Sequence, residues 1–567
     1  MKPTTLSLAF LGSSLVAGHA LHQREDAFKV PTINTTSGMV SGHAASNTTG
    51  VSVYLGIPFA APPVGDLRFA PPQPYKGIGN INGTKSGFTC PASASPPVSA
   101  VGNITVPGAN LLTIIGQSEL PLSEDCLTLN IWVPSGGEKN KAVLLWIYGG
   151  GFSVGGAAVP FYDGQYFAEQ EDVIIVAINY RVNIFGFPGN PAEPNANLGL
   201  LDQRIAVEWT RDNIPAFGGD ASRITMFGQS AGSASLEYYA YAWKEDPIVA
   251  GLIQQSGSID HNNPSAQEAK SVESSWFSVS KGLGCGDASS DHNEVLKCMR
   301  TKDMEDILAY VPGFTGASNL TFNPVADEIT IFSDFEERTK AGNFSKVPLL
   351  MGTVDYETGL TIGLGLTDPK AVGHPQKYWD NIDEHSMCSV GERANISISH
   401  DAPTWRYRYF GVWPNMQLTT YPDSGAWHTI DVLAVFDFVP RGPGIPDQTP
   451  AQISTGKYMR GAWAAFAKDP KEGLKRYEKG WPLYNPAEDT LIRLAYNNQT
   501  GTNLGSPSQY DKGCNSTFPF PVDGSAASNE THAANPNSSP AAFNGGSRLG
   551  SSLGVVFLVA IITAFAY

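Results

Sequence analysis

Positive charge is scarce in this chain. Its 567 residues contain 37 lysines and arginines against 53 aspartates and glutamates, which gives a formal net charge of −16. Nucleic-acid binding depends on cationic side chains that neutralise phosphates. The charge balance therefore argues against a nucleic-acid partner. Charged residues make up 16% of the chain and apolar residues 42%, a composition that predicts a large buried core.

Cysteine is also scarce, with six residues in the whole chain. None lies in a C-x-x-C motif and no histidine cluster accompanies them, so no zinc site is expected. Six cysteines fit a disulfide framework in an exported protein. The sequence alone allows many pairings. Pairing near neighbours would join Cys90 to Cys126 and Cys285 to Cys298, and would leave Cys388 with Cys514.

The N-terminus has the pattern of a secretory signal peptide. Lys2 precedes an apolar run from Leu6 to Ala17, and small residues follow as far as Ala20. We expect residues 1–20 to be a signal peptide that is cleaved after Ala20. Asn-X-Ser/Thr sequons along the chain, such as Asn34 and Asn82, agree with export and glycosylation.

The C-terminus has a second apolar run, Leu553–Tyr567, with no basic residue after it. As a helix it would reach about 22 Å, short of a hydrocarbon core of about 30 Å. Asn544, Gly545 and Gly546 supply small residues before a polar spacer, the order of a GPI-attachment signal. Residues 545–567 are therefore predicted to be a propeptide that is exchanged for a membrane lipid anchor. A marginal transmembrane helix or a buried C-terminal helix is the alternative.

Between these signals we expect one large domain, residues 21–514, and then a glycosylated stalk, residues 515–544, rich in Ser, Asn and Pro. In the domain, short apolar runs alternate with helical patterns, one of which places Leu198, Leu201, Ile205 and Trp209 on one helix face. This alternation predicts an α/β fold whose mostly parallel central sheet is covered by helices on both faces. The strand candidates are residues 143–147, 173–178, 224–227, 252–253 and 347–351.

A nucleophile motif follows one of these strands. Gly228-Gln229-Ser230-Ala231-Gly232 lies between the strand candidate 224–227 and a helical run, 233–243. In G-x-S-x-G, glycines permit an abrupt strand-to-helix turn that exposes the serine. Ser230 is therefore the predicted nucleophile. Ser256, in Gln-Ser-Gly, lacks the preceding glycine and is the poorer candidate.

A glycine-rich loop, Tyr148–Phe152, follows the strand candidate 143–147. Consecutive glycines allow backbone N–H groups to converge on one point, as a developing oxyanion requires. Together with the residue after the nucleophile, this loop predicts an oxyanion hole made by Gly150, Gly151 and Ala231.

Several segments together resemble the type-B carboxylesterase family, which includes cholinesterases and fungal extracellular lipases. They are Phe59–Phe69, Ser123–Asn130, Tyr148–Phe152, Asn213–Asp220 and Phe227–Gly232. The resemblance covers residues 30 to 515. It implies a single α/β-hydrolase domain, hydrolysis of a small-molecule ester, no cofactor or metal, and the triad order serine, acid, histidine. The family's order of disulfide bridges also agrees with the near-neighbour pairing.

The resemblance further selects the other triad members. Glu357 lies five residues after Gly352, where the family has its acid, although Thr358 stands where the family usually has glycine. Asp355 is the alternative acid. His428 follows a glycine-led segment that matches the family's histidine. The resemblance also implies a structural ion pair between Arg68 and Glu124, and a role for Ser256 in steadying Glu357.

Substrate class is indicated by what the segment from Cys90 to Cys126 contains. It has no aromatic residue, whereas cholinesterases place there a tryptophan that binds quaternary ammonium. A cholinesterase is therefore not expected. The apolar residues Leu111–Ile115 favour a lipase flap as an alternative to a small-ester site. Two other hypotheses are a catalytically inactive cell-surface adhesion protein and a peptidase. The intact serine, acid and histidine argue against the adhesion protein.

Overall fold

The structure is a computed structural model that describes residues 30–516, except 94, 118–119, 136–138, 260–265, 312–319, 368–373 and 385–387. The predicted signal peptide, the stalk beyond residue 516 and the predicted GPI-attachment segment lie outside the described residues. Within the described part, none of the helices combines the length and the apolar character that a membrane span needs.

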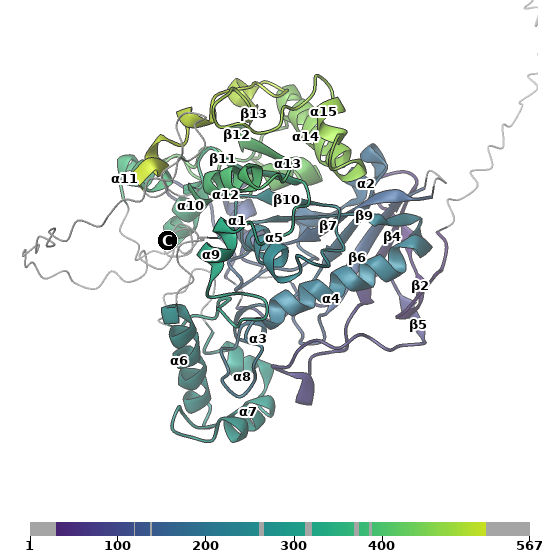
Figure 1. Cartoon of the computed structure of the whole chain (residues 1–567), viewed down its shortest axis with the longest axis vertical. Helices are drawn as coiled ribbons and strands as arrows, with labels where there is room; N and C mark the ends of the chain where they lie inside the picture. The colour runs from purple at the N-terminus through teal and green to yellow at the C-terminus, as the bar shows by residue number, and fades with distance from the viewer. Residues whose placement is uncertain are drawn as a thin grey trace, which may run out of the picture.

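A ten-stranded sheet forms the centre of the molecule (Figure 1), in the order β13-β12-β11-β10-β9-β7-β8-β6-β4-β3. Strands β8, β7, β9, β10, β11, β12 and β13 run parallel, and β6, β4 and β3 are antiparallel at one edge. The predicted mostly parallel sheet is thus confirmed. The strands are β3 (His43–Ala44), β4 (Val51–Pro58), β6 (Thr128–Pro134), β7 (Lys141–Ile147), β8 (Ile174–Ile178), β9 (Gly219–Gln229), β10 (Gly251–Gln255), β11 (Leu349–Val354), β12 (Thr404–Tyr409) and β13 (Ile492–Leu494). A separate small sheet contains β1 (Ile33–Thr35), β2 (Gly38–Ser41) and β5 (Asn80–Asn82).

Helices cover both faces of the central sheet, so every residue of β7 and β8 is buried. This burial explains their continuous apolar sequences. One group of helices contains α2 (Gln165–Glu171), α13 (Ile430–Phe436) and α14 (Pro450–Lys468), which pack on one another. The other contains α4 (Leu198–Asn213), α5 (Ala231–Ala242) and α12 (Cys388–Ser399), which pack on β9 to β12. Shorter helices are α3 (Asn183–Gly186), α9 (Phe335–Lys340) and α15 (Gly473–Arg476).

The buried face of α4 differs from the predicted stripe. Leu201 and Ile205 are only half-buried, while the charged residue Asp202 is fully buried. Asp202 is buried because it accepts two hydrogen bonds from the guanidinium of Arg181, at 2.8 and 2.9 Å. An apolar periodicity cannot reveal a helix face that carries such a pair.

Helices α6 (Ala266–Gly282), α7 (His292–Arg300) and α8 (Met304–Leu308) lie together at the bottom of Figure 1, away from the sheet, and share a second hydrophobic cluster. The expected ion pair between Arg68 and Glu124 links these helices to the rest of the domain. The guanidinium of Arg68 binds Glu124 and also donates to the carbonyl oxygens of Met299 and Arg300, at the end of α7. Disulfide bonds join the three expected pairs, Cys90–Cys126, Cys285–Cys298 and Cys388–Cys514.

Candidate active site

Ser230 stands on a sharp turn between β9 and α5. Its backbone has φ +57° and ψ −124°, a conformation that L-residues rarely adopt. Neighbouring glycines make the turn possible, because a Cβ atom on Gly232 would lie 2.2 Å from the carbonyl oxygen of Ile147, and one on Gly228 would lie 2.7 Å from the backbone of Gly232. The turn therefore has the sharp strand-to-helix geometry that the motif predicts.

The glycine-rich loop after β7 lies directly against this elbow. A Cβ atom on Gly149 would be 2.8 Å from Cβ of Ser230, so only glycine allows this approach. Gly150 has φ +112° and Gly151 has φ +59°, values that favour glycine. The loop thus folds back over Ser230.

Three N–H groups near Ser230 have no protein acceptor among the described residues. They belong to Gly150, Gly151 and Ala231, the predicted oxyanion-hole donors. The N–H of Ala231 is free because the first residues of an α-helix have no intrahelical acceptor. At the N-terminus of α5 the helix dipole adds positive potential. This geometry suits the binding of a negative oxygen next to Ser230.

His428 and Glu357 meet from two different elements. Nδ1 of His428, just before α13, lies 2.5 Å from Oε2 of Glu357, which follows β11. The second carboxylate oxygen of Glu357 accepts the N–H of Val354 at 2.9 Å, and the residue is 2% exposed. A carboxylate only accepts hydrogen bonds, so Nδ1 is the donor in this contact, and in the neutral ring Nε2 is then the acceptor.

Asp355, the alternative acid, faces elsewhere. Its carboxylate accepts a hydrogen bond of 2.8 Å from Nε of Arg408, and its side chain is 40% exposed. Of the two candidate acids, Glu357 is therefore the one that contacts His428.

The turn after Glu357 departs from the family pattern, and the structure shows how it is held. The backbone N–H and the hydroxyl of Thr358 both donate to Oδ1 of Asp383, at 2.9 and 3.2 Å, from the end of α11 (Gln376–Asp383). A glycine follows one position later, and α10 (Gly359–Thr367) begins there. Burial, reinforced by the nearby charge of Glu357, raises the pKa of Asp383 to about 7.

One contact of the site was not predicted. The side-chain nitrogen of Gln229 lies 2.9 Å from Nε2 of His428, and Gln229 is 3% exposed. No hydrogen bond joins Ser230 to His428 in the described part of the chain. The only sequence signal for this contact is that Gln229 directly precedes the nucleophile.

The expected contact of Ser256 with Glu357 is not present. The Ser256 hydroxyl is buried and has no hydrogen-bond partner within the described residues. Glu357 is held instead by Val354 and His428. Behind the site, the fully buried Asp431 accepts hydrogen bonds from Gln255 and Tyr407 at 3.0 and 2.8 Å, and burial raises its pKa.

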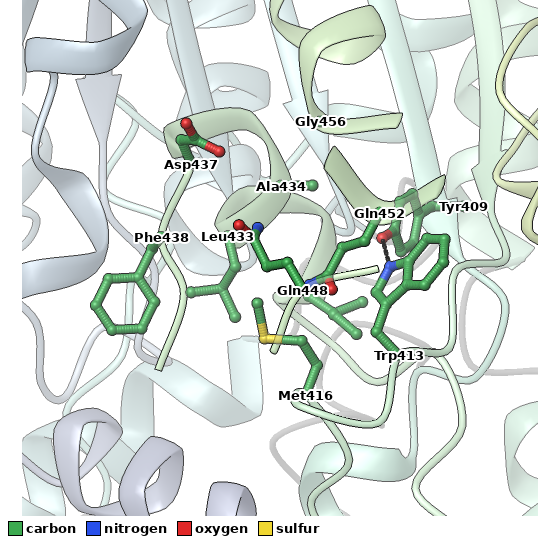
Figure 2. A pocket seen from close by; sticks show the side chains of 11 residues that line it. Tyr409, Trp413, Met416, Leu433, Ala434, Asp437, Phe438, Gln448, Gln452 and Gly456 are labelled. Carbon is green, nitrogen blue, oxygen red and sulfur yellow. Dashed lines mark hydrogen bonds between the residues drawn. The ribbon is translucent and has the colours of Figure 1, made fainter. Parts of the chain in front are cut away.

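A pocket opens on α13, the helix that follows His428 (Figure 2). Ile430, Leu433 and Met416 give it an apolar lining, and Trp413, also in the lining, donates a hydrogen bond of 2.8 Å to the hydroxyl of Tyr409. The lining includes none of the predicted catalytic or oxyanion residues. It is therefore a neighbouring feature, separate from the site around Ser230.

Among the described residues, no group of three or more His, Cys, Asp or Glu side chains is arranged to hold a metal ion. The groups around Ser230 are a hydroxyl, an imidazole, a carboxylate and backbone N–H groups. A serine on a sharp strand-to-helix turn, a histidine paired with a carboxylate and free N–H donors are the groups that serine hydrolases of the α/β-hydrolase fold use.

Comparison with known proteins agrees. Residues 29–389 match the carboxylesterase family. A chlorogenic acid esterase of Aspergillus niger is 33% identical over 487 residues, 82% of this chain and 90% of that protein. Secreted lipase 5 of Gibberella zeae is 33% identical with the same coverage, and an acetylcholinesterase of Bungarus fasciatus is 34% identical over 82% of both chains. The chain belongs to the carboxylesterase family and is a carboxylic ester hydrolase.

Proposed function

We propose that Ser230, Glu357 and His428 are the catalytic triad of this esterase. The observation that carries the proposal is the 2.5 Å contact between Nδ1 of His428 and Glu357, beside a serine on a strained elbow. The carboxylate holds the ring in the tautomer whose Nε2 can accept a proton. A catalytically inactive adhesion protein would not require a histidine paired with a carboxylate beside a serine on a sharp turn.

The reaction proceeds through an acyl-enzyme. His428 takes the Ser230 proton as the hydroxyl oxygen attacks the ester carbonyl, and the N–H groups of Gly150, Gly151 and Ala231 bind the oxyanion. The imidazolium, stabilised by Glu357, then protonates the departing alcohol. Water, deprotonated by the same histidine, hydrolyses the acyl-enzyme and releases the acid.

The substrate in this proposal is a small ester without a cationic group. Helix α1 (Val106–Ile115), within the Cys90–Cys126 loop, has no charged or aromatic residue that would attract a cation. The names of the fungal relatives, an esterase of chlorogenic acid and a secreted lipase, leave both a soluble and a lipid substrate as candidates.

The contacts of α1 favour dissolved esters over a lipid interface. A Cβ atom on Gly108 would lie 2.1 Å from the carbonyl oxygen of Leu418, and the N–H of Thr105 donates to the same oxygen at 3.0 Å. Leu111 and Leu112, which would line a lipase flap, are 0% and 1% exposed. A helix held by these contacts is expected to form a fixed side of the substrate site rather than a flap that opens at a lipid surface. Rates should therefore show no jump when a short-chain ester passes its solubility limit, whereas a jump would favour the lipase.

Export and attachment to the outer membrane surface through a GPI lipid complete the proposal. They rest on the terminal sequence patterns and on the relative named as a secreted lipase. Phosphatidylinositol-specific phospholipase C should release the enzyme from intact cells. Recovery of a C-terminal peptide containing Phe557 from the mature protein would contradict removal of the tail.

The triad is tested by Ser230→Ala, with Ser256→Ala as the matched control. Both serines are buried and neither side chain fills much space, so both variants should fold. Hydrolysis of an aryl ester should be lost in the first, and should be unchanged in the second. Activity of Ser230→Ala within about tenfold of the wild type would reject the assignment.

A further inference from the structure

The side chain of Gln229 contacts Nε2 of His428, the atom that must accept the serine proton in the reaction. In a neutral ring whose Nδ1 donates to Glu357, Nε2 is an acceptor, so the Gln229 amide donates its N–H across the 2.9 Å contact. The amide oxygen of Gln229 lies against the glycine-rich loop, 2.9 Å from where a Cβ on Gly149 would be. One buried side chain therefore touches both the histidine and the loop that covers Ser230.

We propose that Gln229 is a positioning residue, whose amide fixes the place and tautomer of His428 in the resting enzyme and yields Nε2 to the Ser230 hydroxyl when an ester binds. This inference rests on the triad proposed above. It explains why Nε2 of His428 contacts Gln229 and has no hydrogen bond to Ser230 among the described residues, a separation that the catalytic mechanism tolerates.

The absence of charge on Gln229 matters to the reaction. Two carboxyl groups already act on the imidazole, Glu357 through Nδ1 and Asp431 from within the core of the protein. A third carboxylate at Nε2 would stabilise the imidazolium, which cannot accept the serine proton. An amide orients the ring without this effect, because it donates a hydrogen bond but carries no charge.

The test compares pH–rate profiles of kcat/KM for Gln229→Glu, Gln229→Met and the wild type with a soluble aryl ester. In Gln229→Glu the acid limb should move to higher pH by about one unit or more, since the active neutral histidine forms only at higher pH. In Gln229→Met, which keeps the side-chain bulk but loses the donor, the limb should move less than in Gln229→Glu because no charge is added. Its kcat/KM on the plateau should fall by about tenfold, because His428 is no longer held in place in the free enzyme.

Gln203→Glu is the matched control. Gln203 is also a buried glutamine, 1% exposed, and its amide donates to Ser235 on α5 rather than to the histidine. It should leave the acid limb where it is, whatever a buried carboxylate costs in stability. An unshifted limb in Gln229→Glu, or full kcat/KM in Gln229→Met, would overturn the inference. Activity that survives Ser230→Ala would instead overturn the triad itself.

Discussion

Replacing Glu357 with glutamine should reduce kcat/KM by about 10³. During the reaction His428 becomes an imidazolium whose charge lies about 4 Å from that of the carboxylate, and at an effective dielectric constant near 20 this attraction is about 4 kcal/mol. Each 1.36 kcal/mol of lost transition-state stabilisation is a factor of ten, so the loss is about three powers of ten. Glutamine also offers an N–H where Nδ1 needs an acceptor, which favours the wrong tautomer.

The matched variant is Asp355→Asn, the same change two residues away. Asp355 pairs with Arg408 at a 40% exposed position, where an ion pair contributes about 0–1 kcal/mol to stability. Its kcat/KM should therefore stay within about twofold of the wild type. Initial rates with an aryl acetate, measured with equal amounts of folded protein, would compare the two. A larger loss of kcat/KM in Asp355→Asn than in Glu357→Gln, or a loss of less than tenfold in Glu357→Gln, would show that Glu357 is not the acid that stabilises the imidazolium.

Two further substitutions test the turns that support the site. Gly232→Ala should lower the free energy of unfolding by about 1–3 kcal/mol, because its Cβ would lie 2.2 Å from a carbonyl oxygen. Gly365→Ala, at an open position on α10, should not lower it. Denaturant midpoints would compare the two variants, and equal midpoints would contradict the geometry of the turn at Ser230. Asp383 has a pKa raised from 3.8 to about 7, so the folded protein keeps a proton that the unfolded chain loses, and stability should fall as pH rises through that range. Asp383→Asn keeps an oxygen for Thr358 but cannot ionise, so its melting temperature should fall less between pH 5 and pH 8 than that of the wild type; an equal fall would show that Asp383 does not cause it.

The parts of the fold that could be predicted from the sequence are those set by local patterns. β7 and β8 are continuous β-branched runs because both of their faces are buried, and the elbow at Ser230 has glycines where any Cβ would clash. Strand β12 was not predicted, because it alternates arginines with aromatic residues. Its Arg406 is buried only because Asp511, 105 residues away, accepts its hydrogen bonds.

The same distinction applies to the site. Glu357 and His428 could be named because the family resemblance supplied their spacing, and residue chemistry alone left Asp355 open. The hydrogen bonds from Thr358 to Asp383 and from Gln229 to His428 join residues that are 25 and 199 positions apart in the chain. No periodicity or motif in one sequence encodes such contacts, since they depend on how the elements pack.

Covalent labelling is the most direct test of whether Ser230 is the nucleophile. The folded enzyme would be treated with a fluorophosphonate until ester hydrolysis stops, and the modified peptide would be identified by mass spectrometry. If Ser230 is the nucleophile, each chain should carry one phosphonyl group, on Ser230, and Ser230→Ala should not be labelled. Modification of Ser256 instead, or full inhibition without any label on the peptide that contains Ser230, would contradict this assignment.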